Sequence, residues 1–459
     1  MYKIDFSAPM HVHFIGIGGI SMSGLAEILL DWKFVVSGSD MKESDLTKSL
    51  VAKGMKVSYP QATKNITDDI DVVIYTAAIH PDNPEFKAAV AKHLPMLTRA
   101  DLLGQIMAQY ERSIAVAGTH GKTTTTSMIS QILLRGQDDP TISIGGFLKA
   151  IQSNIHVGDS DLFLTEACEY TNSFLSFFPK YSVILNVEAE HLDFFKDIND
   201  IRDSFHQFAC NTASDGALII NGEIEEVKTI TEGLDCEVIT FGHLNSNDYF
   251  PQGVVFDELG CATFTPICKG TALPKITLHV PGMHNVTNAL AAIAVARAMN
   301  LPYQQIQQGL ADFGGANRRF EYKGTFQGAT VIDDYAHHPT EIAASLEAAS
   351  NYPHERLIVC FQPHTYTRTL AFLDDFARVL SKADLVVLAD IYAAREKDVY
   401  NISSKDLQEK IAAAGTRCEY FSTFDEIETF LQKNCMNGDL LITMGAGNVY
   451  MIGENLVQQ

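Results

Sequence analysis

The sequence predicts an α/β protein of three domains, each built around an open and largely parallel sheet. Strand-like apolar runs alternate with helix-like segments along the chain, which is the pattern of doubly wound folds. The 459 residues correspond to about three domains. One stretch of alternating apolar and polar residues predicts a small antiparallel insertion. We therefore expect Rossmann-like domains at residues 1–110 and 317–459, and a P-loop ATPase-like sheet with the insertion at residues 111–316.

Composition and charge narrow the class of protein. The net charge of −22 would repel nucleic-acid phosphates over most of the surface. No apolar run approaches the ~18 residues of a membrane helix, and the first residues lack the apolar segment of a signal peptide. The eight cysteines form no C-x-x-C pair, as in reduced cytosolic proteins. We expect a cytoplasmic monomer or homodimer that binds small molecules rather than nucleic acid or membranes.

The first block opens with a strand, a glycine-rich turn and a helix. The strand-like residues 11–15 precede Gly16-Ile-Gly-Gly-Ile-Ser21, and residues 22–30 are helix-like. Such a turn presents backbone N–H groups to a diphosphate. Asp40 lies where an acidic residue meets the ribose in NAD-binding folds, but Ser21 replaces the third glycine of that fingerprint. The ligand is therefore NAD or another diphosphate. The expected contacts are Gly16, Gly18, Gly19, Ile20, Ser21 and Asp40.

The second block contains a phosphate-binding loop between strand-like residues 113–117 and helix-like residues 127–135. Glycines let backbone N–H groups converge on phosphate oxygens. Lys122 can reach the β- and γ-phosphates, and the Thr123 hydroxyl can bind Mg²⁺. Val116 stands where a full Walker A pattern has its first glycine, so the match is imperfect. The expected nucleotide contacts are Gly118, Thr119, His120, Gly121, Lys122, Thr123 and Thr124.

An acidic residue and a histidine follow two further strands of this block. Residues 161–165 predict a buried strand that ends at Glu166, and residues 181–185 predict another that leads to His191. Polar residues at the carboxyl ends of parallel strands gather at one edge of the sheet. Glu166 is a natural Mg²⁺ ligand. His191 is either a less usual ligand or a hydrogen-bonded loop residue.

The remaining polar motifs lie on either side of the predicted boundary at residue 316. After the insertion at residues 247–280, Asn285 and Asn288 precede a helix predicted over residues 289–299, where they are either caps or ligand contacts. The third block has strand-like runs at residues 329–332, 356–361, 385–389 and 440–444. Its motifs Asp333–Pro339 and Gln362–Arg368 follow strands. The two adjacent His beside paired Asp in the first motif indicate a metal site or an anion or substrate pocket.

Two function classes agree with these motifs: an oxidoreductase that uses NAD, and an ATP-dependent ligase or kinase whose first domain binds a different diphosphate. The order of the motifs distinguishes them. The motifs are Gly16–Ile20, Gly118–Thr124, Glu166–Tyr170, His191–Asp193, His284–Asn285 with Asn288, Asn317–Phe320, Asp333–His338 and Gln362–His364. In this order they closely resemble the Mur ligases of peptidoglycan synthesis, over essentially the whole chain.

The resemblance implies a substrate for each domain. It replaces NAD in the first domain by the UDP moiety of UDP-N-acetylmuramate. The lactyl carboxylate of that substrate would attack the γ-phosphate of ATP, and the amine of L-alanine would attack the resulting acyl phosphate. The Gly16–Gly19 loop and the Asp333–His338 motif favour this member of the family. The alternative is the recycling ligase of the same fold, which joins a whole tripeptide to the same sugar nucleotide.

The resemblance also implies residue roles. Lys122 would grip phosphate, while Thr123, Glu166 and His191 would bind Mg²⁺. His284 and Asn288 would contact adenine. Either Arg318 or Arg319, together with Asp334, would reach the nucleotide from the C-terminal domain. We expect Lys122, Glu166, His191 and Arg318 to be catalytic. The amino-acid pocket would contain Tyr335, His337 and Arg368.

Three departures from the family pattern stand out. Thr365 replaces an arginine that some members have, which removes one cation from the expected alanine site. Residues 204–206 contain no lysine, so no carbamylated lysine is expected as a Mg²⁺ ligand. Ser21 replaces a frequent glycine, which a backbone contact tolerates if φ is negative there.

Overall fold

The computed structural model describes residues 2–76, 78–191, 194–394 and 396–458. Its contacts divide the chain into two compact units. The first unit comprises Met1–Tyr249 and Leu290–Gly309, and the second comprises Phe250–Ala289 and Leu310–Gln459. The three α/β sheets confirm the predicted fold class. The division at residues 110 and 316 stays a prediction, because the contacts follow other boundaries.

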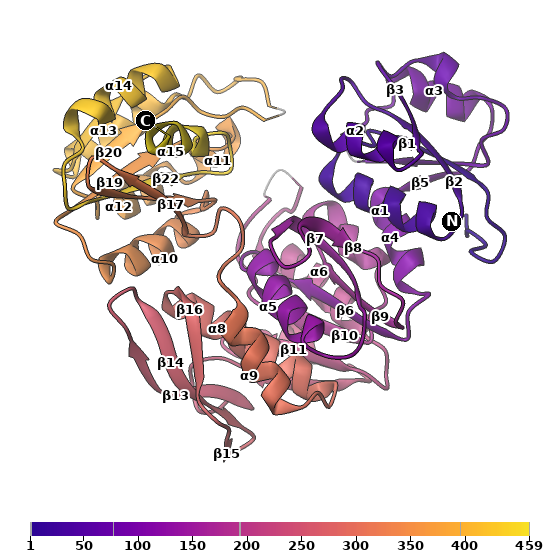
Figure 1. Ribbon diagram of the computed structural model, residues 1–459, viewed down its shortest axis with the longest axis horizontal. Helices are drawn as coiled ribbons and strands as arrows, with labels where there is room; N and C mark the ends of the chain where they lie inside the picture. Colours follow the sequence, from indigo (N-terminus) through magenta and orange to yellow (C-terminus); the bar gives the residue numbers. More distant parts are fainter. Residues whose placement is uncertain (1, 77, 192–193, 395, 459) are drawn as a thin grey trace. The chain divides into compact units, whose positions relative to one another are not determined.

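The N-terminal block of the first unit, drawn in indigo and violet in Figure 1, is a parallel sheet. Its five strands have the order β3-β2-β1-β4-β5. This order matches the first five strands of the Rossmann order 3-2-1-4-5-6. The strands are β1 (His11–Ile15), β2 (Val35–Ser39), β3 (Lys56–Ser58), β4 (Val72–Tyr75) and β5 (Met96–Thr98). The helices are α1 (Ile20–Asp31), α2 (Asp45–Ala52), α3 (Pro84–Ala91) and α4 (Arg99–Met107).

The central block continues the first unit with a mainly parallel sheet. Its strands follow the order β12-β11-β10-β6-β9-β7-β8, in which β8 is antiparallel to β7. The strands are β6 (Arg112–Ala117), β7 (Thr141–Leu148), β8 (Ser153–His156), β9 (Leu162–Glu166), β10 (Tyr181–Ile184), β11 (Ala217–Asn221) and β12 (Glu237–Phe241). The helices are α5 (Lys122–Leu134), α6 (Ile198–Cys210) and α7 (Val227–Thr231). Strands β10, β6 and β9 are neighbours, so their carboxyl ends lie at one edge.

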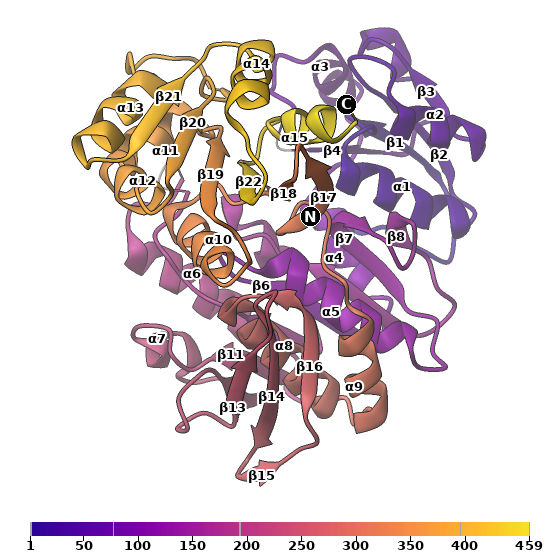
Figure 2. The same ribbon diagram turned by 60° about the vertical axis from the view of Figure 1, so that its left-hand side comes forward.

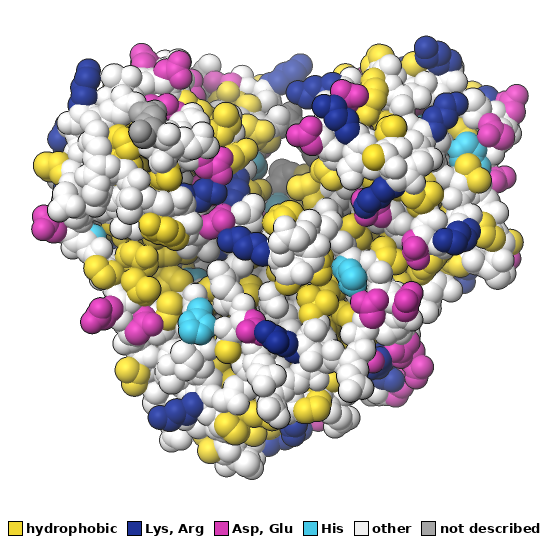
Figure 3. All heavy atoms as spheres, viewed as in Figure 1, with side chains coloured by type: hydrophobic (Ala, Val, Ile, Leu, Met, Phe, Trp, Pro, Cys, Tyr) yellow, Lys and Arg dark blue, Asp and Glu magenta, His cyan; other side chains and the backbone are white. Residues whose placement is uncertain are grey.

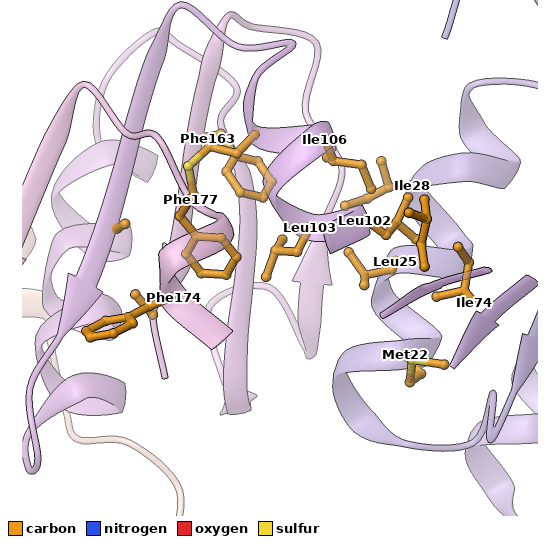
Figure 4. Close-up of a cluster of buried hydrophobic side chains, with 14 of the residues drawn as sticks. Met22, Leu25, Ile28, Ile74, Leu102, Leu103, Ile106, Phe163, Phe174 and Phe177 are labelled. Atoms are coloured by element: carbon orange, nitrogen blue, oxygen red, sulfur yellow. The ribbon is translucent and has the colours of Figure 1, made fainter. Parts of the chain in front are cut away.

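One hydrophobic core joins the N-terminal and central blocks (Figure 4). Met22, Leu25 and Ile28 of α1 pack in the same cluster as Leu102 of α4 and Phe163 of β9. All five side chains are almost fully buried. The two blocks therefore form one packed body.

The second unit contains the predicted antiparallel insertion and the C-terminal sheet. The insertion consists of β13 (Tyr249–Phe256), whose first residue belongs to the first unit, β14 (Cys261–Cys268), β15 (Thr271–Ala272) and β16 (Ile276–Pro281). The C-terminal sheet has the order β17-β18-β22-β19-β20-β21, with only β17 antiparallel to its neighbour among the described strands. The strands are β17 (Glu321–Phe326), β18 (Ala329–Asp334), β19 (Arg356–Phe361), β20 (Leu385–Leu388), β21 (Arg417–Tyr420) and β22 (Asp439–Met444).

Helices cover both faces of this C-terminal sheet (Figure 2). Side chains of α10, α12 and α13 form one core, and those of α14 and α15 form another. The helices are α10 (Pro339–Ser350), α11 (Tyr366–Ala371), α12 (Leu373–Leu380), α13 (Ser404–Ala413), α14 (Phe424–Asn434) and α15 (Tyr450–Val457). The doubly covered sheet explains the near-continuous apolar runs of β19 and β20.

Two helices start earlier than the sequence predicts. Helix α5 begins at Lys122 rather than near Ser127, because Gly121 adopts the left-handed conformation that starts it. Helix α8 (Met283–Ala298) begins before Asn285. Asn285 and Asn288 therefore lie inside the helix, and their interpretation as caps is wrong. Helix α9 (Tyr303–Asp312) follows it.

The surface of the molecule carries side chains of every type. On the face that Figure 3 shows, acidic and basic side chains are interspersed with hydrophobic and uncharged ones. None of the helices described is both long and apolar enough to cross a membrane. The eight cysteines, all in the described part of the chain, are free thiols.

Candidate functional site

The glycine loop after β6 has the backbone geometry of a phosphate-binding loop. Gly118 has φ +142° and Gly121 has φ +81°, both in the region that side chains disfavour. A Cβ atom on Gly118 would lie 3.0 Å from the Cβ of Leu185. Gly121 then starts α5 without a side-chain cap. The first N–H groups of this helix remain available to an anion.

The loop is fastened to the segment that follows β10. The His120 amide donates to Asn186 Oδ1 at 2.7 Å, and Asn186 Nδ2 donates to the His120 carbonyl at 3.1 Å. The Thr119 hydroxyl accepts from the Glu188 amide at 3.0 Å. The side chains of Asn186 and Thr119 therefore shape the loop, and phosphate contact by Thr123 and Thr124 stays a prediction.

Lys122 sits at the beginning of α5 with its amine turned back over the loop. Nζ donates to the carbonyls of Gly118 and Thr119 at 2.5 and 3.1 Å. It also lies 3.0 and 3.3 Å from the two carboxylate oxygens of Glu169. Although burial disfavours the charged amine, the charge of Glu169 raises the pKa of Lys122 above its ordinary value. Lys122 is a fixed cation in this site.

Glu166 faces the hydroxyl side of the same helix start. Its two oxygens accept from Thr123 Oγ1 at 3.1 Å and from the Gly145 amide at 2.7 Å. A Cβ atom on Gly145 would lie 3.0 Å from Glu166 Oε2, so glycine permits this approach. A hydroxyl and a carboxylate that converge in this way are oxygen donors of the kind that Mg²⁺ prefers, and they fit the predicted metal.

His191 contacts a different glutamate from the one that the sequence paired with it. Its Nε2 lies 3.6 Å from Glu169 Oε1, and its ring lies 4.6 Å from the ring of Tyr170. Its backbone is left-handed, with φ +55°, which is a strained conformation of the kind found at functional sites. Asp193 of the same motif lies outside the described residues. The structure therefore brings His191 to the site through Glu169.

Glu169 belongs to this cluster, although the sequence motif gave it no role. Only 3% of it is exposed, and it contacts both Lys122 and His191. Burial opposes ionisation, but the charge of Lys122 and the nearby His191 side chain hold the pKa of Glu169 below its ordinary value. The signal was present in the Glu166–Tyr170 motif, whose second acidic residue received no role.

The predicted diphosphate turn of the N-terminal block is held by Ser39 and Asp40. The Ser39 carbonyl accepts from the amides of Gly16 and Ile17. Asp40 Oδ2 accepts from the Gly18 amide at 2.8 Å, while Oδ1 accepts from the Met41 amide. Both oxygens of Asp40 thus bind backbone and shape the turn. Its contact with a substrate stays a prediction.

The turn ends in the first residues of α1. Gly19 precedes the helix, and Ile20 begins it with a side chain that is 48% exposed. Ser21 lies inside the helix, where φ is negative, so its replacement of glycine causes no backbone strain. Arg99 Nη1 donates to Ser21 Oγ at 3.1 Å. The turn therefore has a neighbouring cation that the sequence analysis did not single out.

In the second unit, the donors of Arg318 bind its own sheet. The guanidinium contacts Asp333 at 2.9 Å and the carbonyls of Gly445 and Gly447 at 2.7 and 3.0 Å. The guanidinium carbon lies 4.5 Å from the ring of Tyr450. Through these contacts Arg318 joins β18 to the segment after β22.

Arg319 and Asp334 lie beside Arg318 and Asp333 in the chain. Arg319 pairs with Glu341 at 3.6 Å and lies over the ring of Tyr335. Asp334 is buried and accepts from Ser345 Oγ at 2.9 Å and from the Ala336 amide at 2.7 Å. Burial raises the pKa of Asp334 to about 6, against the opposing charge of Arg319. Of the two arginines, Arg319 has the looser contacts.

The adenine contacts that the resemblance implies lie on the first turns of α8. Asn288 Nδ2 donates to Asn285 Oδ1 at 3.2 Å, and Asn285 Nδ2 donates to the Pro281 carbonyl at 2.7 Å. His284 is exposed on the same turns. These two side-chain hydrogen bonds orient Asn288. Its contact with adenine stays a prediction.

The predicted amino-acid residues form one cluster at the carboxyl ends of β18 and β19. The rings of Tyr335 and His337 lie 5.4 Å apart, and those of His337 and His364 lie 5.7 Å apart. Arg368 Nη1 is 2.9 Å from His364 Nδ1. Thr365, with φ +65°, starts the short helix that presents Arg368. The structure thus brings together Tyr335, His337 and Arg368, and adds His364 to them.

This fold, together with the phosphate loop and its acidic neighbours, defines a nucleotide-dependent enzyme of modular α/β construction. Residues 11–111 match the catalytic domain of the Mur ligase family, residues 116–296 the Mur ligase middle domain and residues 318–447 the glutamate ligase domain of Mur ligases. The chain belongs to the Mur ligase family.

Particular relatives narrow the comparison. The chain is 63% identical to the UDP-N-acetylmuramate–L-alanine ligase of Agathobacter rectalis, over the whole of both chains. It is 27% identical to the crystal structure of the UDP-N-acetylmuramate–alanine ligase of Thermotoga maritima, with a TM-score of 0.82 and 98% of each chain covered. A murein peptide ligase from Psychrobacter arcticus is 24% identical with a TM-score of 0.72 over 98% of each chain, which shows the shared fold alone.

Proposed function

We propose that this protein joins L-alanine to the lactyl carboxylate of UDP-N-acetylmuramate in the synthesis of peptidoglycan precursors, with ATP as the energy source. The observation that carries this proposal is the 63% identity, over the full length of both chains, with a protein of that name. The intact phosphate loop with Lys122, Thr123 and Glu166 supports it. Because ATP and nucleotide sugars are cytoplasmic metabolites, we place the protein in the cytoplasm.

The reaction would form the amide bond in two steps. The carboxylate attacks the γ-phosphate of ATP, which releases ADP and leaves an acyl phosphate. The amine of alanine then attacks the acyl carbon, loses a proton and expels inorganic phosphate. Both reactants of the first step are anions, so their approach depends mainly on positioning and on charge neutralisation.

The chain's own residues supply much of that neutralisation. The N–H groups at the start of α5 and the ammonium of Lys122 would hold the phosphates. Thr123, Glu166 and His191 would hold Mg²⁺, which supplies further positive charge when bound. In the C-terminal domain, Arg319 and Asp334 would contact the nucleotide, and His284 and Asn288 would contact adenine. Arg318 would act indirectly, because its contacts hold in place the segment that carries Arg319.

We assign the other two substrates to the outer domains. The turn Gly16–Ser21, shaped by Asp40, would bind the diphosphate of the sugar nucleotide in residues 1–110. In residues 317–459, Arg368 would bind the carboxylate of alanine through two parallel hydrogen bonds. Tyr335 and His337 would border the methyl group. Residues 111–316 would bind ATP.

One assay tests the proposal. Release of inorganic phosphate from ATP should require UDP-N-acetylmuramate and L-alanine together. Phosphate release with L-Ala-D-Glu-meso-diaminopimelate in place of alanine would instead indicate the recycling ligase. Titration calorimetry should show binding of UDP-N-acetylmuramate, and micromolar binding of NAD without the sugar nucleotide would overturn the assignment of the first domain.

A further inference from the structure

The two glutamates of the segment after β9 have different partners. Glu166 accepts from Thr123 and from the Gly145 amide. Glu169, three residues later, lies against Lys122 and His191. Its side chain is 4% exposed, against 18% for Lys122 and 25% for His191. Glu169 is therefore the most buried member of the trio and lies between the other two.

Lys122 has no donor left for a phosphate in this arrangement. An ammonium group has three N–H donors, and the acceptors around Nζ are the carbonyls of Gly118 and Thr119 and the carboxylate of Glu169. The two carbonyls belong to the loop itself, whereas Glu169 comes from another segment. A phosphate oxygen that binds Lys122 must therefore displace one acceptor, and Glu169 is the anionic one with which it competes.

Glu169 has a second partner ready to take its charge. His191 Nε2 lies 3.6 Å from Glu169 Oε1, slightly beyond a normal hydrogen bond. A carboxylate that accepts a hydrogen bond from one ring nitrogen fixes the orientation of the imidazole. The other ring nitrogen is then free of a proton and can bind a metal ion. Release of Glu169 from Lys122 would let it close on His191.

We propose that Glu169 is a positioning residue that exchanges partners: it pairs with Lys122 while the phosphate site is empty and orients His191 once Lys122 binds phosphate. This inference rests on the proposed nucleotide site. In this proposal the carboxylate of Glu169 orients His191 only after a phosphate has bound Lys122. It also makes Glu169 a competitor of the nucleotide for Lys122.

The competition gives a test that needs neither turnover nor metal. ADP binding to the full-length protein is measured by calorimetry in EDTA, for wild type and for Glu169→Gln. Because the amide lacks the competing charge, Glu169→Gln should bind ADP roughly 3- to 10-fold more tightly. AMP has no β-phosphate for Lys122, and its affinity should not change. Glu169→Asp keeps the charge and should lie nearer to wild type.

A matched control is Glu27→Gln, which removes the carboxylate from another lysine pair of the same unit, Glu27 with Lys53 at 2.6 Å. It should leave ADP affinity unchanged. The partner exchange also predicts a lower kcat for Glu169→Gln without a higher KM for ATP. A merely structural role would lower kcat and raise that KM together.

Each outcome separates the inference from the proposed function. If wild type binds no ADP, the nucleotide site itself is wrong. If wild type binds ADP but folded Glu169→Gln binds it equally or more weakly, the exchange is wrong while the nucleotide site stands. Equal tightening for ADP and AMP would also overturn the exchange, because the effect would then not involve Lys122.

Discussion

Removal of the Lys122 amine should lower both the melting temperature and the turnover number of the protein, for two different physical reasons. Lys122→Met takes the nearer partner from Glu169, 3% exposed, and leaves it with His191 at 3.6 Å. Breaking a buried pair on one side costs about 3–5 kcal/mol. For a unit of this size, each kcal/mol corresponds to roughly 2–4 °C, so the melting temperature should fall by roughly 6–20 °C. Turnover should fall at least ~100-fold, the scale for losing a key charge-stabilising donor.

The double variant Lys122→Met/Glu169→Gln distinguishes the two effects. It removes both charges, so most of the lost melting temperature should return while turnover stays low. Calorimetry and the phosphate-release assay measure the two quantities on the same samples. Two results would contradict a stabilising buried pair. One is an equal melting temperature for Lys122→Met and wild type, and the other is an equal melting temperature for the double and the single variant.

The same pair predicts a pH dependence of known sign. The pKa of Glu169 is lowered in the folded protein, so the pair contributes stability above the unfolded pKa of ~4.3 and loses it as the pH falls. The melting-temperature difference between wild type and Lys122→Met should therefore be full at pH 7 and should shrink in acid. A difference that grows in acid would contradict the ion pair.

Three further predictions concern the other groups. His191→Ala should raise the Mg²⁺ concentration for half-maximal rate about 10-fold or more, and an unchanged Mg²⁺ dependence would leave His191 as a loop residue. Arg368→Lys should raise the KM for alanine at least ~10-fold, because lysine cannot make two parallel hydrogen bonds, whereas equal losses for all three substrates would indicate another role. The pKa of Asp334 is raised to about 6, so the folded state favours the protonated form and wild type should lose on the order of 3 kcal/mol as the pH rises from ~3 to 7. Asp334→Asn should lack that slope in denaturant titrations at several pH values, and an equal slope in both proteins would refute the shifted pKa.

The fold was predictable wherever strands are buried on both faces. Residues 356–361 and 440–444 are apolar runs and form β19 and β22 in the middle of the C-terminal sheet. Strands β17 (Glu321–Phe326) and β21 (Arg417–Tyr420) were not predicted. They lie at the two edges of the sheet, where one side faces solvent and polar residues interrupt the pattern.

The site was predictable where a motif sets the geometry locally. Lys122 and Thr123 follow from the glycine loop, and Glu166 follows from the end of a strand. Glu169 did not, because the segment after β9 turns through left-handed residues at 171 and 172, and sequence spacing does not give side-chain direction in such a segment. The internal contacts of Arg318 depend on the pairing of β18 with β22, which are more than a hundred residues apart.

The hydrophobic cluster shared by the N-terminal and central blocks makes their unfolding a joint event. Since Leu25 and Phe163 belong to one buried cluster, neither block can open alone without exposing the apolar surface of the other. A ligand that binds only the native state stabilises the whole cooperative body by an amount set by its concentration relative to Kd. A sugar nucleotide on the first block would thus slow hydrogen exchange in the strands around the phosphate loop without touching them. Each substrate would then protect the backbone of both blocks from unfolding, although it contacts only one of them.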